Sequence, residues 1–229
     1  MSVIVVKVGG AVAESTASQL LDLATQCCKV VFQPDAGVVR ADRALAAFGS
    51  GLEIRAGTKV LSLVPGGVET DKGTIEADAV VVAAGAWASQ LVPGLPVTPT
   101  RETVSYFELA DERPVPSVID YVNREIYALT GGPGRLKVGV HRTGPATDPD
   151  EPGAPDPEIV GFASDWAARM FELARPEPVA VETCIYTNTV DARFVIERHG
   201  PVVICSACSG HGFKFATAVG KRVAELVVG

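Results

Sequence analysis

The chain has 229 residues, of which 47% are hydrophobic and 21% are charged, so it can bury a core and is not disordered by composition. Its net charge of -7, with Lys and Arg scattered, argues against a nucleic-acid partner and against an anionic membrane surface. No apolar run is long enough to span a bilayer, and Lys7 interrupts the opening apolar stretch, so we expect no signal peptide, a cytoplasmic location and reduced cysteines.

The first third of the chain alternates short apolar segments with glycine-rich turns. We predict strands at residues 3–8 and 29–33, with an amphipathic helix at 14–24 between them. A second helix over 41–48 is expected to end at Gly49. Short β segments separated by glycines then follow at 52–54, 58–64, 67–70 and 74–75.

The remaining two thirds contain longer β segments and two helices. Residues 145–158 carry five of the sixteen prolines and are expected to form an exposed loop. We predict strands at 79–83, 97–109, 121–129, 136–140, 183–187, 194–197 and 202–206, and helices at 166–174 and 213–227. Strands mixed with crossover helices, around a β-rich middle, predict an α/β or α+β fold with two intertwined regions.

Five separated segments resemble one enzyme family, in the family's order. They are FQPDAGVVRADRALAAF, ADAVVVAAGAWASQLVPGLPVTPTRETVSYFEL, GRLKVGVHRTGPATDPD, ETCIYTNTVDARFVIE and SACSGHGFKFATAVGKRVAEL. From about Val31 onward the chain resembles monomeric sarcosine oxidase and N-methyltryptophan oxidase, flavin-dependent amine oxidases of the D-amino-acid-oxidase-like superfamily. Several motifs in the right order are specific, whereas any one alone would be weak.

This resemblance implies a fold, a cofactor and substrates. An incomplete FAD-binding Rossmann-like region, made of residues 1–95 and 182–229, would be intertwined with an antiparallel β-rich substrate domain at 96–181. The cofactor would be FAD, and the substrates a small amino acid and oxygen.

Cys184 matches the cysteine that bonds covalently to the flavin in this family. The chemistry is reasonable, because a thiolate can attack the electron-poor methyl position of an oxidised flavin. A buried strand cysteine is the alternative, and the commonest fate of a lone Cys. Tyr186, Thr187 and Asp191, in register with the family motif, favour the flavin link.

Lys137 and His141 match the family's Lys-x-Gly-x-His element beside the flavin. The resemblance implies that Lys137 assists the reaction with oxygen, where a fixed positive charge stabilises developing negative charge. Lys137, Gly139 and His141 are two residues apart and are predicted to project to one face of a strand. A solvated lysine on a strand edge is the alternative.

Lys214 matches a lysine that pairs with the substrate carboxylate. His211, between Gly210 and Gly212 and ahead of Phe213, opens the last predicted helix. Backbone N–H groups and the positive helix end there would meet the flavin's pyrimidine oxygen. An ordinary turn with a surface histidine is the alternative, but the flanking glycines favour close approach of a ligand.

Other candidates follow from the same motifs. Tyr127 and Tyr186 would line the substrate cavity, or else serve as core aromatics. Gly85 and Trp87 are further candidates for cofactor binding. The CxxC formed by Cys205 to Cys208 has no second pair and no histidine at metal spacing, so we expect no metal site.

The opening stretch departs from the family. The sequence VGGAVA lacks the third glycine of GxGxxG, and its first two glycines are adjacent. In the family this stretch follows the central strand of the dinucleotide-binding sheet, a place that residues 3–8 would have to take. The first 25 or so residues resemble an acetylglutamate kinase instead, whose first strand ends in Lys-x-Gly-Gly. Nothing later continues that pattern, so we predict that Lys7 to Gly10 hold no phosphate.

Three functions therefore stay open. The first is an FAD-dependent oxidase of a secondary amine, with sarcosine, another N-methyl amino acid or a cyclic amine such as proline as substrate. The second is a non-catalytic remnant, or a subunit whose partner chain supplies the dinucleotide-binding domain. The third, a small-carboxylate kinase, is supported by the opening stretch alone and ranks below the others.

Overall fold

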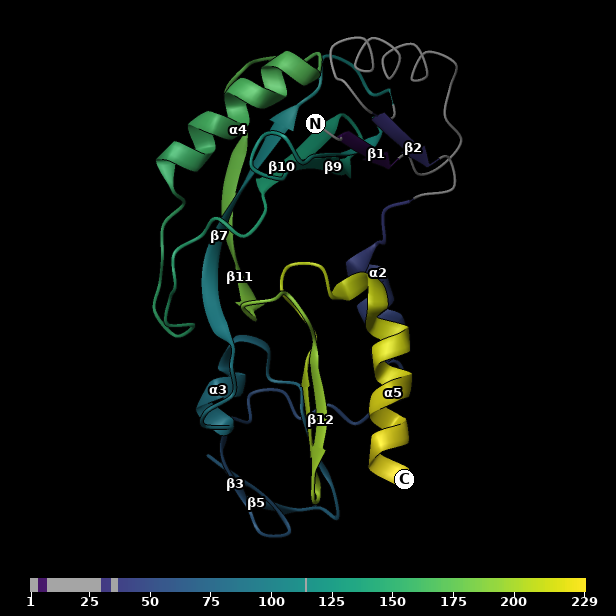
Figure 1. Cartoon of the computed structure of the whole chain (residues 1–229), viewed down its shortest axis with the longest axis vertical. Helices are drawn as coiled ribbons and strands as arrows, with labels where there is room; N and C mark the ends of the chain where they lie inside the picture. The colour runs from purple at the N-terminus through teal and green to yellow at the C-terminus, as the bar shows by residue number, and fades with distance from the viewer. Residues whose placement is uncertain (1–3, 8–29, 34–36, 114) are drawn as a thin grey trace. The chain divides into compact units, whose positions relative to one another are not determined.

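A computed structural model describes residues 4–7, 30–33, 37–113 and 115–229 of the chain (Figure 1). The helix predicted at 14–24 lies outside these residues. The chain divides into two compact units, each assembled from segments far apart in the sequence. Unit 1 contains Met1–Val38, Arg101–Pro145 and Pro152–Cys184, and unit 2 contains Val39–Thr100, Ala146–Glu151 and Ile185–Gly229.

A seven-stranded sheet in the order β11-β7-β10-β9-β8-β1-β2 forms the base of unit 1. Its strands are β1 (Ile4–Lys7), β2 (Val30–Gln33), β7 (Thr98–Glu108), β8 (Ser117–Asp120), β9 (Ile126–Gly132), β10 (Arg135–Val140) and β11 (Ala180–Asn188). Strands β7, β10, β9 and β8 pair antiparallel in that order. The opening strand β1 pairs antiparallel with β8 and parallel with β2.

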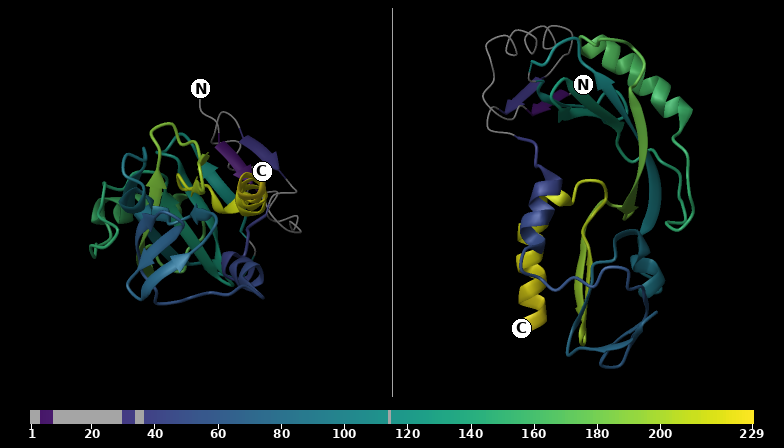
Figure 2. Two further views of the ribbon diagram at one scale, coloured as in Figure 1. Left: turned by 90° about the horizontal axis from the view of Figure 1, so that it is seen from below. Right: turned by 180° about the vertical axis from the view of Figure 1, so that it is seen from behind.

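Helix α4 (Pro157–Met170) packs on one face of this sheet, as Figure 2 also shows. Its buried residues Ile159, Ala163, Trp166 and Ala167 recur at helical spacing and join a core with apolar residues of β7, β8, β9 and β10. Asp156 caps the helix by accepting hydrogen bonds from the backbone N–H groups of its second and third residues. The predicted helix at 166–174 is therefore wrong in extent, because Pro157 begins the helix at its first position, where a missing N–H costs nothing.

A buried carboxylate joins α4 to the sheet. Asp120, at the end of β8 and 2% exposed, accepts a hydrogen bond of 2.9 Å from the indole Nε1 of Trp166. It also accepts bonds from the backbone of Val122 and from both nitrogens of Asn123. These bonds make residues 121–125 a turn, so the strand predicted at 121–129 begins only at Ile126. The strand before the turn, β8, was not predicted from the sequence pattern.

Unit 2 contains two small sheets and several helices. One sheet has the order β12 (Val195–His199), β13 (Val202–Ser206) and β6 (Val80–Val82), with β13 and β6 parallel. The other is an antiparallel meander of β3 (Val60–Val64), β4 (Gly67–Thr70) and β5 (Gly73–Glu76). The helices are α2 (Ala41–Gly49), η1 (Gly85–Trp87), α3 (Ala88–Leu91), η2 (Phe213–Phe215) and α5 (Ala216–Val228).

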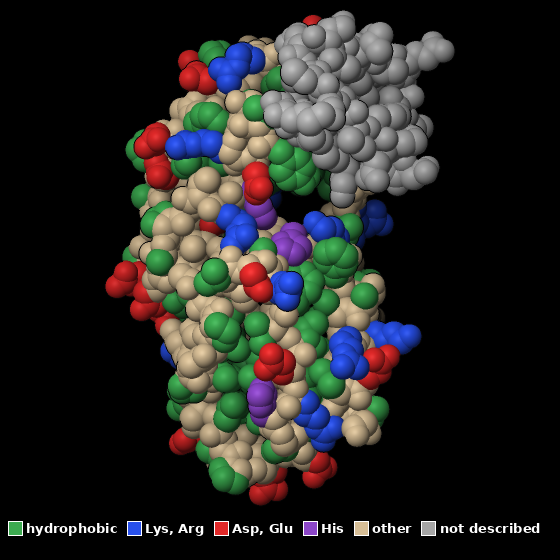
Figure 3. All heavy atoms as spheres, in the orientation of Figure 1, with side chains coloured by type: hydrophobic (Ala, Val, Ile, Leu, Met, Phe, Trp, Pro, Cys, Tyr) green, Lys and Arg blue, Asp and Glu red, His purple; other side chains and the backbone are tan. Residues whose placement is uncertain are grey.

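The surface of unit 2 retains apolar side chains, some of which Figure 3 shows near β12 and α5. The exposed ones include Leu45 and Phe48 of α2 and Phe215 before α5. Residues 52–54, predicted as a strand, are irregular, and Leu52 and Ile54 are exposed. None of the helices that the structure describes combines the length and the apolar character needed to cross a membrane.

Candidate functional site

The face of the unit 1 sheet opposite α4 carries the first group of predicted site residues. In β10, Leu136, Val138 and Val140 point into the core beneath α4, so Lys137 and Gly139 point to the other face. Lys137 lies directly opposite Tyr106 of β7, and Gly139 lies opposite Tyr127 of β9. Half-buried polar side chains from neighbouring strands therefore share this face.

Gly139 is required by the position of Tyr127. A Cβ atom at Gly139 would lie 2.6 Å from the Tyr127 hydroxyl oxygen and 2.7 Å from its ring, which is closer than any real Cβ contact. The ring of Tyr127 therefore lies over Gly139, on the Lys137 side of the sheet. Packing against Tyr127 therefore explains why a glycine stands in the Lys-x-Gly-x-His element, which the sequence alone did not explain.

Tyr106 lies between Lys137 and strand β11. The Lys137 Nζ atom is 6.0 Å from the centroid of the Tyr106 ring, within range of a cation–π interaction. The Tyr106 hydroxyl donates a hydrogen bond of 3.1 Å to the Glu182 carboxylate. Burial, reinforced by this bond and by the charge of Glu182, raises the pKa of Tyr106 to about 12, so the hydroxyl keeps its proton at neutral pH.

Cys184 is exposed on strand β11, two residues after Glu182. Residues two apart on a strand point to the same side. The charges of Cys184 and Tyr127 also contribute to the raised pKa of Tyr106. Lys137, Tyr127 and Cys184, which the sequence nominated separately, thus share a sheet face with a tyrosine that it did not nominate.

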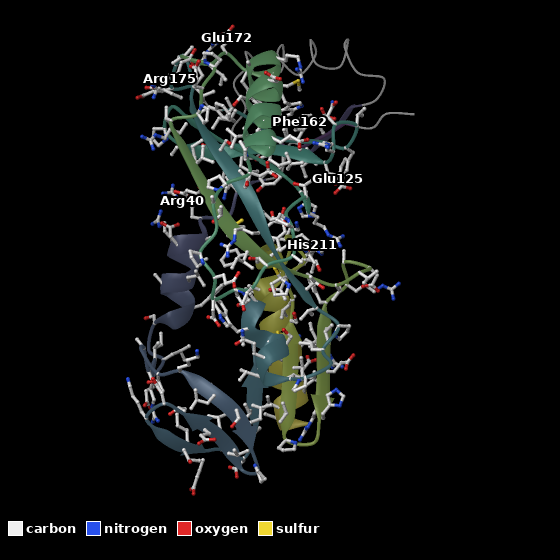
Figure 4. All side chains as sticks on the ribbon, turned by 90° about the vertical axis from the view of Figure 1, so that its left-hand side faces the viewer. Arg40, Glu125, Phe162, Glu172, Arg175 and His211 are labelled. Carbon is white, nitrogen blue, oxygen red and sulfur yellow. The ribbon has the colours of Figure 1, made fainter. Side chains whose placement is uncertain are left out.

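His141 was predicted to share a strand face with Lys137 and Gly139, but β10 ends at Val140 and His141 lies in the turn after it. Its backbone N–H donates to the carbonyl of Glu125, which Figure 4 labels. The turn is held by Glu102, a carboxylate of β7 that is only 1% exposed. Glu102 accepts hydrogen bonds of 3.0 and 2.9 Å from the backbone N–H groups of Thr143 and Gly144. The sequence offered one signal for Glu102, a charged residue within a β-like run, but gave no partner for it.

The second group of predicted residues lies in unit 2, in the turn between β13 and α5. His211 is half-buried there, near the start of α5 (Figure 4). Its ring stacks on Phe194 with centroids 5.1 Å apart and contacts Phe215 edge-on. The His211 Nδ1 atom is 3.0 Å from the carbonyl oxygen of Ser209. Because a carbonyl only accepts, Nδ1 carries a proton, and in the neutral ring Nε2 is the acceptor.

The backbone of this turn is fixed by residues of β11 and by close packing. Ser209, with a positive φ of 46°, donates its N–H to the carbonyl of Thr187. The N–H of Thr187 in turn donates to the Cys208 sulfur at 3.3 Å. Burial raises the pKa of the Cys205 thiol. Among the described residues, no three His, Cys, Asp or Glu side chains gather in a way that could hold a metal ion.

Gly212 is the position in this turn where a side chain does not fit. Its φ of -72° suits any residue, but a Cβ would overlap the carbonyl oxygen of Ala207. We expect Gly212→Ala to lower the free energy of unfolding by about 2 kcal/mol, since the backbone must move. Gly220, inside α5 with nothing within 4 Å of its Cβ position, is the matched control. Gly220→Ala should raise stability by about 0.5 kcal/mol or more, because alanine favours helix.

Urea unfolding followed by circular dichroism measures both substitutions. Midpoints that move in opposite directions would support the steric role of Gly212. Equal behaviour of the two variants would show that the turn relaxes around a methyl group.

The other nominated residues of unit 2 are placed as follows. Lys214 is exposed, with its Nζ atom 5.7 Å from the Phe215 ring, and Phe213 is 38% exposed. Tyr186 is half-buried on β11, two residues after Cys184. Gly85 begins η1 with a φ of 53°. The Trp87 indole donates a 2.8 Å hydrogen bond to Asp150, which is the main cause of the lowered pKa of that carboxyl.

Comparison with known proteins gives a family match over nearly the whole chain. Residues 7–226 match the model of the family described as DAO, FAD dependent oxidoreductase. The chain is 32% identical over 219 residues to peroxisomal sarcosine oxidase of Homo sapiens, covering 83% of this chain and 56% of the human protein. It is 33% identical over 228 residues to monomeric sarcosine oxidase of Bacillus sp. (strain B-0618), covering 86% and 57%. The chain thus spans a little over half the length of these curated relatives.

Solved structures show the same fold. An L-proline dehydrogenase from P. horikoshii superposes with a TM-score of 0.69 at 25% identity, covering 80% of this chain and 53% of that one. A glycine oxidase from Geobacillus kaustophilus gives a TM-score of 0.72 at 20% identity, covering 99% and 70%. These likenesses confirm the mixed α/β fold with antiparallel sheets that the sequence predicted.

Proposed function

We propose, from the premise that this chain belongs to the DAO family of FAD dependent oxidoreductases, that it oxidises a secondary amine of a small amino acid and passes the electrons to oxygen. The observation that carries the proposal is the sheet face of unit 1 that Lys137, Tyr127 and Cys184 share with Tyr106. Sarcosine oxidases are among the relatives, which favours an N-methyl amino acid as substrate.

The chemistry of these side chains fits the ring end of FAD. Cys184 offers an exposed thiol, which is the group needed for a covalent bond to the ring. Lys137 offers a cation on the same sheet face, and Tyr127 offers a hydroxyl above a glycine that leaves space for it. FAD, when bound, supplies a two-electron acceptor for a hydride from the N-methyl or α-carbon of the amine.

Each residue has a separate role in the proposed reaction. Lys214 would bind the substrate carboxylate, while Tyr127 and Tyr186 orient the amine. The substrate would lose a hydride from carbon and the proton from its nitrogen, which leaves an imine that water would hydrolyse. Oxygen takes up two electrons and two protons to give hydrogen peroxide, and the ammonium of Lys137 stabilises the negative charge that develops on oxygen.

His211 and its turn would act on the cofactor rather than on the substrate. With Nδ1 held by Ser209, the imidazole presents Nε2 outward from a ring clamped by Phe194. Gly210, Gly212 and Phe213 would supply backbone contacts beside it, and Gly85 and Trp87 are further proposed contacts. His141, in the turn held by Glu102, would support the cofactor next to Lys137.

A second candidate is a subunit or remnant without oxidase activity of its own. The opening sequence VGGAVA lacks the family's glycine pattern, and β1 pairs with β8 and β2 rather than with β13. A pyrophosphate in such folds is held by the glycine turn that follows a central strand. In this case a partner chain would supply the dinucleotide-binding segment.

A visible absorption spectrum of the purified protein, recorded before and after acid precipitation, tests the proposal. Yellow colour that stays with the precipitate is the expected result and indicates covalent flavin. Yellow colour that is released into the supernatant would show that the protein binds flavin but does not hold it covalently. A colourless protein that takes up no added FAD would overturn the proposal in favour of the second candidate. For a yellow protein, flavin bleaching by sarcosine, N-methyltryptophan or proline without oxygen would identify the substrate.

A further inference from the structure

Glu182 is a carboxylate on the same sheet face as the proposed catalytic lysine. It lies on β11, separated from β10 and Lys137 by strand β7. Two strand spacings amount to roughly 9.5 Å, a span that a glutamate and a lysine side chain can bridge by extending toward each other. Glu182 is therefore a carboxylate that the Lys137 ammonium could pair with.

The structure shows a different arrangement. Glu182 accepts the 3.1 Å hydrogen bond from the Tyr106 hydroxyl, while Lys137 lies over the Tyr106 ring. Among the described residues, Lys137 takes part in none of the ion pairs within 4.0 Å. Tyr106, on the strand between β10 and β11, thus binds Glu182 through its hydroxyl and lies within cation–π range of Lys137 through its ring.

We propose that Tyr106 is a positioning residue, whose hydroxyl holds the Glu182 carboxylate so that it does not form an ion pair with Lys137. The inference rests on the proposed function, because the ammonium is useful to oxygen only while no carboxylate neutralises it. A carboxylate paired with Lys137 would cancel the positive field that the reaction needs. The same hydrogen bond directs the Glu182 side chain toward β7. Cys184, two residues further along β11, points to the same side of that strand.

The raised pKa of Tyr106 supports this role. A phenol that keeps its proton to about pH 12 stays a hydrogen-bond donor throughout the physiological range. The charged and titratable groups on this face include Lys137 of β10, Tyr106 and Glu108 of β7, Tyr127 of β9, and Glu182, Cys184 and Tyr186 of β11. Glu102 of β7 also lies on this face, but its carboxylate binds the backbone N–H groups of Thr143 and Gly144. Of these carboxylates, Glu182 is the one that the hydroxyl of Tyr106 binds.

Competitive acetylation of lysines tests the proposal without requiring flavin. Trace acetic anhydride is applied between pH 7 and pH 10, and modification of Lys137 is measured by peptide mass spectrometry relative to exposed Lys221 in the same sample. An ion-paired ammonium reacts more slowly, because the pair holds the proton on the amine. We expect Tyr106→Phe to lower the Lys137 to Lys221 ratio about threefold, the effect of one partly exposed ion pair.

Removing the carboxylate should reverse that effect. Glu182→Gln alone should leave the ratio unchanged, and Tyr106→Phe combined with Glu182→Gln should restore the wild-type ratio and pH profile. Local unfolding would instead expose Lys137 and would not be rescued by the second substitution. An unchanged or raised ratio in Tyr106→Phe, or a ratio that stays low in the double variant, would overturn the proposal.

These outcomes are separate from those of the proposed function. Labelling is measured on the protein as purified, with or without flavin. A colourless protein would refute the proposed oxidase activity, but the effect of Tyr106 on Glu182 could still be measured. In a yellow protein, the rate at which reduced flavin reacts with oxygen should fall in Tyr106→Phe and recover in the double variant. If the protein is an active oxidase but the labelling of Lys137 is unaltered in Tyr106→Phe, the role of Tyr106 is refuted and the proposed function is retained.

Discussion

Replacing Cys184 by alanine is expected to abolish covalently held flavin completely. Cys184 is exposed on the sheet face that carries Lys137, and a thiol is required to form a thioether to the ring. Alanine fits this exposed strand position without strain, so the fold should be retained. The measurement is the mass of the denatured chain, together with flavin absorbance in the acid precipitate.

Cys205→Ala is the matched control for this substitution. Cys205 is a half-buried cysteine of β13, outside the face that carries Cys184. Its loss should leave the flavin mass unchanged. Flavin that remains attached in Cys184→Ala, or disappears in Cys205→Ala, would assign the link to another cysteine.

Lys137→Met is expected to slow the reaction of reduced flavin with oxygen by about a hundredfold or more. Removing one preorganised charge or donor from a site where negative charge develops typically has an effect of this size. Methionine keeps the length and the apolar stem of lysine, so packing against Tyr106 should persist. Stopped-flow mixing of the substrate-reduced enzyme with oxygenated buffer measures the rate.

Two further variants make the result specific to the charge of Lys137. Lys221→Met removes an exposed lysine of α5 and should reoxidise at the wild-type rate. Lys137→Arg keeps the positive charge and should recover part of the rate. Wild-type reoxidation in Lys137→Met would remove the oxygen role from this lysine, whereas slower reduction alone would move its role to substrate binding.

The local pattern of the sequence predicted much of the fold correctly. Residues 202–206 and 67–70 form strands with the bounds expected, and the predicted strand at 136–140 is β10 but for one residue. Turn glycines bound these strands, and alternation or continuous apolar character marks the buried faces. Helix α2 likewise ends at Gly49, as predicted.

The predictions that failed involve contacts between distant residues. The start of α4 depends on the cap at Asp156 and on the core beneath Trp166, whereas the prolines before it read as loop. Strand β8 depends on Asp120, whose partner Trp166 is 46 residues away. Residues 52–54 had β-like composition but pair with no strand in the part of the chain that the structure describes, and composition alone does not make a sheet.

The sequence by itself determined the family and nominated residues for the candidate site. Motif order identified an FAD dependent oxidoreductase, and the match of individual motifs to that family nominated Lys137 and Cys184, because both kinds of information lie in the residues along the chain. Only the tertiary structure brought Tyr106 between Glu182 and Lys137 and placed β1 beside β8. Strand neighbours and buried polar pairs depend on which edges and partners the whole fold makes available, and local periodicity contains no information about that choice.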